Sequence, residues 1–148
     1  MKEIKLTKNV HSSANSGIID FLTICEEIGI TVRFKLADRL EERGLTVRKC
    51  AELTGLRLGT ISDIMNGNKT SITFQHIWIL MIVLCITDIN DLIELHLPEH
   101  VTSFFDEMSE KWIDSKEIPA TSKFAGDMIN LQPVDPLGYK RLMNFLEK

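Results

Sequence analysis

Four long cationic side chains lie close together in the stretch from 46 to 69 of this 148-residue chain. Together with Asn66 they make a set of five residues, which are Arg48, Lys49, Arg57, Asn66 and Lys69. Guanidinium, ammonium, amide and backbone N–H groups are the usual partners of nucleic-acid phosphate oxygens. We therefore expect phosphate contacts here, with ordinary solvated surface as the alternative. The residues expected to touch phosphate are Arg48, Lys49, Asn66 and Lys69.

A second set of side chains in the same stretch has the chemistry to read bases. Asp63 can accept a hydrogen bond from a cytosine amino group, and Leu58 can contact a thymine methyl group. The residues expected to face bases are Arg57, Leu58, Gly59, Thr60 and Asp63. Phosphate contact is also open to Arg57. The charge of Asp63 repels phosphate, so a solvated position remains the alternative for this residue.

Two short helices must position these residues, and the sequence TVRKCAELTGLRLGTISDIMNGN from 46 to 68 predicts both. Thr46 is a suitable N-cap for the first run, in which Val47, Cys50 and Ala51 share one face. Gly55 allows the positive φ that ends this run and redirects the chain.

The second run extends from 57 to 66 and ends at Gly67. Its helical spacing is expected to bury Ile61, Ile64 and Met65. The residues left toward the outside are Leu58, Gly59, Ser62, Asp63 and Asn66. Two short helices at a steep angle, with the second exposed along one face, predict a helix-turn-helix.

The stretch GLTVRKCAELTGLRLGTISDIMNG resembles the Cro/CI-type (XRE) helix-turn-helix regulators of phages, plasmids and bacteria. The resemblance covers residues 32–95 and includes SITFQHI and DINDLIEL as the fourth and fifth helices of the domain. The residues at the family's spacing are Ala51, Gly55, Ile61, Ile64 and Gly67. The resemblance implies that the helix from 57 to 66 lies in the major groove, with its N-terminal residues toward base edges.

Several positions depart from the family pattern. Leu40 and Met65 stand where many members pair an arginine with a glutamate, and this joint change strands no buried charge. Val47 replaces a glutamine that reaches phosphate in many members. Leu58 and Gly59 stand where relatives often have polar residues, so few side chains are left to form hydrogen bonds with bases. A protein-interaction module on the same fold, such as an antitoxin or antirepressor-type binder with weak or no DNA readout, is the alternative function.

The distribution of charge also favours the middle of the chain as the site for a polyanion. The net charge is −4, which gives no general attraction to nucleic acid or anionic membrane. Residues 31–70 carry eight Lys and Arg against five Asp and Glu, whereas residues 71–148 carry six against twelve. Affinity for DNA therefore belongs to the middle segment.

The remaining helical periodicity predicts an all-α fold. We expect a five-helix, phage-repressor-like DNA-binding domain at 31–97, with one of its helices at 32–43. A polar tail at 1–15 and an accessory helix at 16–30 precede this domain, and a small acidic helical extension at 98–148 follows it, for dimerisation or regulation. The apolar run at 72–86 is shorter than a membrane span, so we expect no membrane partner. The three cysteines form no Cys-x-x-Cys pair and are expected to be buried thiols of a reduced, cytoplasmic protein.

Two apolar sets exceed what a domain core needs. The helix from 74 to 84 carries the first set in addition to its expected core residues, one of which is Phe74. The second set lies between 101 and 112. The candidate interface residues are Trp78, Ile79, Ile82, Phe104, Phe105, Met108 and Trp112. Packing within the chain is one explanation. A homodimer interface, or a docking face for a regulatory protein or peptide, is the other.

No arrangement of residues predicts catalysis or a cofactor. His96 and His100 are four residues apart, but Pro98 between them argues against one helix that carries both as metal ligands. The sequence contains no Gly-rich phosphate loop and no nucleophile with a neighbouring base. We therefore expect no enzyme, no cofactor and no metal. The leading hypothesis is a sequence-specific DNA-binding transcriptional regulator that acts as a homodimer on an inverted repeat. We favour a repressor over an activator.

Overall fold

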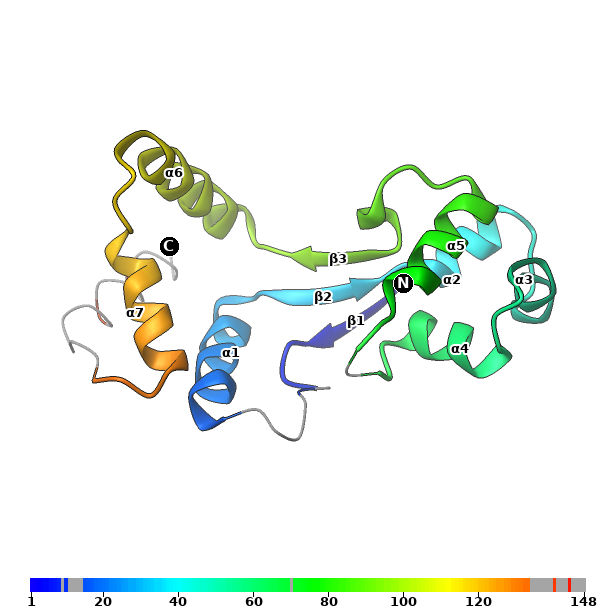
Figure 1. The fold of residues 1–148 in the computed structure, drawn as a ribbon, viewed down its shortest axis with the longest axis horizontal. Coiled ribbons are helices and arrows are strands. Elements are labelled where there is room, and N and C mark those ends of the chain that lie inside the picture. Colours follow the sequence, from blue (N-terminus) through cyan, green and yellow to red (C-terminus); the bar gives the residue numbers. More distant parts are fainter. Residues whose placement is uncertain (9, 11–14, 70, 134–139, 141–143, 145–148) are drawn as a thin grey trace. The chain divides into compact units, whose positions relative to one another are not determined.

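The computed structural model describes residues 1–8, 10, 15–69, 71–133, 140 and 144, and these form seven α-helices, a short 3₁₀ helix and three strands (Figure 1). The chain divides into two compact units. The first contains Met1–His11 and Thr31–His96, and the second contains Ser12–Ile30 and Leu97–Lys148. Elements of the first unit are β1 (Lys2–Lys5), β2 (Thr31–Phe34), α2 (Leu36–Glu42), α3 (Val47–Thr54), α4 (Leu58–Asn66), α5 (Phe74–Leu84), the 3₁₀ helix η1 (Ile89–Asp91) and β3 (Ile93–His96). Elements of the second unit are α1 (Ser16–Ile28), α6 (Glu99–Ser115) and α7 (Ala120–Ile129).

The expectation of an all-α fold is wrong in part, because the mostly helical chain also forms an antiparallel sheet with the order β1-β2-β3. Strand β1 lies in the expected tail and β2 at the start of the helix expected at 32–43. The expected fifth helix is instead η1 followed by β3. Residues 134–139, 141–143 and 145–148 of the helical extension expected at 98–148 lie outside the described residues.

The strands escaped detection because each has only four residues. Side chains of a strand alternate between two faces, and Val32 and Phe34 do alternate with Thr31 and Arg33. A pattern this short cannot be separated from a helical one, and the spacing of Val32, Leu36 and Leu40 by four residues fits a helix equally well.

Strand β2 carries a row of charges across the sheet. Arg33 is opposite Glu3 on one side and Glu94 on the other, and its Nε lies 2.6 Å from a carboxylate oxygen of Glu3. Lys35 follows β2 directly. Its Nζ lies 2.8 Å from a carboxylate oxygen of Glu94, and its backbone N–H donates to the carbonyl of Leu92 at 2.8 Å. The contacts of Lys35 connect the segment that leads into the helices of the first unit to the segment that follows them.

The core of the first unit is continuous from α2 to η1. Its buried residues are Leu36, Leu40, Cys50, Ile61, Ile64, Ile77, Leu80, Leu84, Ile86 and Leu92. The burial expected for Ile61 and Ile64 is confirmed, and Met65 is partly buried against the same core. Phe74 is not a core residue as expected, because 70% of it is exposed and its ring stacks on Trp78 with centroids 6.0 Å apart.

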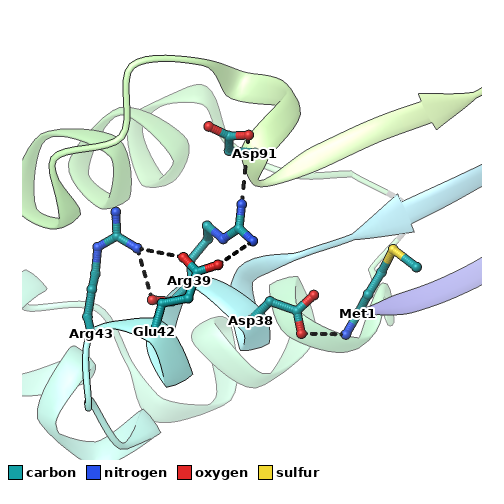
Figure 2. Close-up of polar contacts among 6 residues, drawn as sticks. All are labelled: Met1, Asp38, Arg39, Glu42, Arg43 and Asp91. Atoms are coloured by element: carbon teal, nitrogen blue, oxygen red, sulfur yellow. Dashed lines mark hydrogen bonds and ion pairs between the residues drawn. The ribbon is translucent and has the colours of Figure 1, made fainter.

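Polar contacts around α2 connect it to its neighbours (Figure 2). Arg39 pairs with Glu42 at 2.8 Å and with Asp91 of η1 at 3.7 Å. The Nε of Arg43 donates to the carbonyl of Leu84, at the end of α5, at 2.8 Å. The amino group of Met1 lies 2.8 Å from Asp38 and holds the pKa of that carboxyl below its usual value. Hence α2 and its C-cap residue Arg43 are joined by polar contacts to Met1, to η1 and to α5.

The second unit packs α1 closely against α7. A Cβ added to Gly17 in the first turn of α1 would lie 2.6 Å from the carbonyl oxygen of Ile129 and even closer to that of Met128. Backbone therefore meets backbone where α1 begins and α7 ends. Helix α7 was not predicted, because the segment before it contains Pro119, which serves as its N-cap residue. Among the described residues, no helix is long and apolar enough to cross a membrane.

The ion pairs of the sheet should make the first unit sensitive to acid. Arg33 lowers the pKa of Glu3, and Lys35 lowers that of Glu94. Stabilisation by these carboxylates is therefore complete above their unfolded pKa of about 4.3 and is lost as pH falls through the lower folded values. We expect the free energy of unfolding to decrease below about pH 5, and Glu94→Gln to make that decrease shallower.

The measurement is urea unfolding of the intact chain between pH 3 and 7, followed by circular dichroism. Glu41→Gln is the matched control, because Glu41 is exposed on α2 and forms no ion pair with the described residues. Equal pH dependence of Glu94→Gln and the unchanged protein would contradict the role given to the Lys35–Glu94 pair.

Candidate nucleic-acid interface

Two short helices, α3 and α4, follow each other where the sequence predicts them, with Gly55 at the end of the first. The hydroxyl of Thr46 accepts a hydrogen bond from the backbone N–H of Lys49 at 3.1 Å, which caps α3. Gly55 ends α3 with φ of 73°, and its N–H donates to the carbonyl of Ala51 at 2.9 Å. Only glycine adopts this left-handed conformation at little cost. The N-cap of α3 and the position of the turn are therefore confirmed.

Thr54 also fixes the turn, although sequence analysis did not identify it. Its hydroxyl donates to the carbonyl of Cys50 at 2.7 Å and accepts from the backbone N–H of Leu56 at 3.2 Å. One side chain thus bridges the last turn of α3 and the connection to α4. The available signal was a threonine directly before the helix-ending glycine, since threonine hydroxyls satisfy backbone groups at such positions.

The exposed face of α4 contains most of the residues expected to face bases. Arg57, Leu58 and Gly59 are exposed at its beginning, and Thr60 and Asp63 are half-buried. Leu58 keeps 48% of its surface exposed. A Cβ added to Gly59 would have no described atom within 4 Å other than those of its chain neighbours and of the nearby α4 backbone, so the surface beside this residue is open.

Strand β2 supports the far end of α4. Gly67 follows α4 with φ of 65°, and a Cβ on it would lie 2.5 Å from Cε2 of the Phe34 ring. Phe34 is buried at the end of β2. The ring therefore occupies the space that any other side chain at position 67 would need, and the sheet helps to set where α4 ends.

Two of the expected phosphate contacts are engaged in weak, exposed ion pairs. Nζ of Lys49 lies 3.4 Å from Glu52, and Nζ of Lys69 lies 3.6 Å from Asp63. Asn66 donates from its side-chain amide to the carbonyl of Ser62 at 2.9 Å. Pairs of this kind contribute at most about 1 kcal/mol, so these side chains can exchange partners.

Arg48 and Arg57 are exposed and form no ion pair with any described residue. The other cations of the middle segment differ, because Arg33, Lys35, Arg39 and Arg43 have acidic partners. From 46 to 69 the chain has four cations against two acids. The positive excess noted in the sequence therefore falls on the helix-turn-helix.

The candidate interface residues lie in both units. On α5, Trp78 is 60% and Ile82 77% exposed, while Ile79 is half-buried. On α6, Phe104 is buried, Met108 is half-buried, and Phe105 and Trp112 are exposed. The face of α5 therefore presents apolar surface to solvent, whereas part of the α6 set belongs to the interior of the second unit.

The described residues contain no group of three or more histidine, cysteine or acidic side chains that could hold a metal ion. His96 is in β3 and His100 in α6. Cys25 and Cys50 are buried free thiols, and burial raises the pKa of both, which keeps them protonated and unreactive. Cys85 is exposed, contrary to expectation, because it follows the last residue of α5.

Comparisons with known proteins add no assignment. No family model, no curated protein and no solved structure matches the chain. A role in DNA binding therefore depends on the residues and geometry of α3, the turn and α4.

Two glycines of this site should respond oppositely to alanine. Gly55→Ala should lower the free energy of unfolding by about 1 kcal/mol, because alanine resists positive φ. Gly59→Ala, inside α4 with open space around it, should raise the free energy of unfolding by about 0.5–1 kcal/mol. Urea midpoints from circular dichroism measure both effects. Equal effects of the two substitutions would show that the turn is not where we place it.

Proposed function

We propose that this chain is a sequence-specific DNA-binding regulator of transcription, acting in the cytoplasm as a repressor. A homodimer binds an inverted repeat, and each copy inserts α4 into the major groove. The observation that carries this proposal is the combination of a well-formed helix-turn-helix with a local excess of positive charge and an exposed first turn of α4. Binding, and not catalysis, is the activity.

The beginning of α4 is suited to approach DNA closely. Arg57 is its N-cap residue and makes no side-chain capping bond. The first N–H groups of a helix lack partners within the helix, so they can bind phosphate oxygen. Gly59 lets the backbone approach the duplex without a side chain in between, and Leu58 offers apolar contact to a thymine methyl. Arg48, Lys49 and Asn66 then supply the surrounding phosphate contacts.

The pair between Asp63 and Lys69 gives a way to bring an acid next to DNA. In the free protein Lys69 reduces the repulsion between Asp63 and phosphate. On binding, Lys69 turns to a phosphate oxygen and Asp63 accepts a hydrogen bond from a cytosine amino group. Because the ammonium group of Lys69 is exposed and its pair with Asp63 is long, separation of the two groups costs little.

The outer face of α5 supplies the contact between two copies. Phe74 and Trp78 stack on each other, and Ile82 continues the same apolar surface one turn later. Exposed apolar patches of this kind mark association sites. The same surface, with the thin polar readout of Leu58 and Gly59, also favours the second candidate function, a protein-interaction module that docks a regulatory protein or peptide.

Phosphate contacts should show in the salt dependence of binding. A duplex selected from a randomised pool at two salt concentrations provides the operator. Arg48→Ala or Lys69→Ala should weaken binding to all duplexes alike and reduce the magnitude of the salt slope by about 1. Lys123→Ala removes an exposed cation of α7 and should leave the slope unchanged. Absence of any selected sequence, together with unchanged slopes, would favour the second candidate function.

Dimerisation should depend on α5. Ile82→Ser should convert the dimer to a monomer in sedimentation velocity and weaken binding to the inverted repeat more than binding to a half-site. Ile113→Ser is the matched control, since Ile113 is an exposed isoleucine of α6. A dimer that survives Ile82→Ser, or dissociates equally with Ile113→Ser, would place the contact elsewhere.

A further inference from the structure

The second unit contains a cavity of about 380 Å³ between α1, α6 and α7. We propose that this cavity binds one small, neutral, mostly apolar molecule. The volume lies within the range of about 300–1,000 Å³ typical of small-molecule sites. This inference goes beyond the proposed DNA binding and does not depend on it, because every residue that lines the cavity belongs to the second unit.

The cavity follows from how α1 and α7 pack. They are in backbone contact at Gly17 and Met128, where α1 begins and α7 ends. The cavity is lined instead by the later turns of α1 and by the first turns of α7, where the small residues Ser122 and Ala125 leave space between the helices. The close approach at one end therefore holds the helices in place around the space at the other.

The lining indicates the chemistry of the ligand. No lining residue is charged, so an ionised ligand would lose its hydration without compensation. Six of the thirteen lining residues have aromatic or sulfur-containing side chains, and these are Phe21, Cys25, Phe104, Phe105, Met108 and Trp112. Aromatic faces and a flexible methionine accommodate flat, apolar molecules. A ring compound fits this wall best.

Three of the lining residues carry a hydroxyl group. Ser109 of α6 and Thr121 and Ser122 of α7 belong to the lining. A few convergent polar groups within an apolar wall orient a ligand that has one matching polar atom. Cys25 does not add a nucleophile, because burial raises its thiol pKa and keeps it protonated. Binding is therefore non-covalent.

The test is a fluorescence titration of the full chain with N-phenyl-1-naphthylamine, a neutral aromatic probe with one N–H group. We expect saturable binding of one probe per chain. Ala125→Leu fills the cavity and should weaken binding at least tenfold. Ala120→Leu is the matched control, because Ala120 is exposed at the start of α7 and does not line the cavity; its affinity should be unchanged.

Two further variants locate the probe. Ile82→Ser reduces the apolar face of α5 and should leave probe binding intact. Trp78→Phe leaves Trp112 as the single tryptophan, and its emission should be quenched as the probe saturates. Circular dichroism tests whether each variant is folded. If Ala125→Leu is not folded, Ser122→Leu serves as a second variant that fills the cavity.

Several results would overturn the proposal. They are the absence of saturation, full binding by a folded filled-cavity variant, or loss of binding with Ile82→Ser. A probe affinity that falls as protein concentration rises would also overturn it, since it would show that a second copy of the chain occupies the cavity.

Discussion

Strand β2 is paired on both edges, and this pairing is the constraint on which the first unit depends. It joins β1, from the beginning of the chain, to β3, which follows the last helical turn of the domain. Lys35 carries the connection from β2 directly into α2, while its backbone N–H and its ammonium group both bind residues near β3. Phe34 extends the constraint to α4 by occupying the space beside Gly67. The helix proposed to enter DNA is thus positioned by a sheet as well as by its helical neighbours.

Internal pairing of charge also determines where the positive surface lies. Cations of β2 and α2 are matched with acids of β1, α2, η1 and β3. The charge of these cations is therefore neutralised by the same ion pairs that connect the sheet and α2 to their neighbours. Cations around α3 and α4 have weaker partners or none among the described residues. A protein of net negative charge can in this way present a local positive potential to a polyanion.

The helix-turn-helix was predictable from sequence because its signals are local. Thr46 caps a helix and Gly55 requires positive φ, and the spacing of Ile61 and Ile64 defines one buried face. The sheet was not predictable, because strands of four residues carry too little periodicity and their partners are distant in sequence. Phe74 shows a third limit, since a residue at the first position of a helix can match the apolar spacing and still face solvent.

The sequence is enough to name candidate residues for the site, but it does not show the partners of those residues in the folded chain. Asp63 and Lys69 are close to each other in sequence. Their charged groups come within 3.6 Å of each other only because α4 ends at Gly67. Thr54 was missed for a similar reason, because its two hydrogen bonds exist only once the turn has formed. The cavity of the second unit is lined by residues of α1 and of α6 and α7, which are distant in sequence. A local sequence pattern therefore cannot predict it.

The division of the chain has a consequence for synthesis on the ribosome. Helix α1 precedes all of the first unit except its N-terminal segment Met1–His11, whereas α6 and α7, its partners in the second unit, come after the first unit in sequence. During vectorial synthesis α1 therefore emerges long before its partners, and its apolar face stays unburied while residues 31–96 of the first unit are made. Chains usually fold domain by domain from the N-terminus, and contacts between distant segments form slowly because a long loop must close. The second unit is accordingly the last part to assemble, and the interval before it does so is when the nascent chain is most exposed to aggregation.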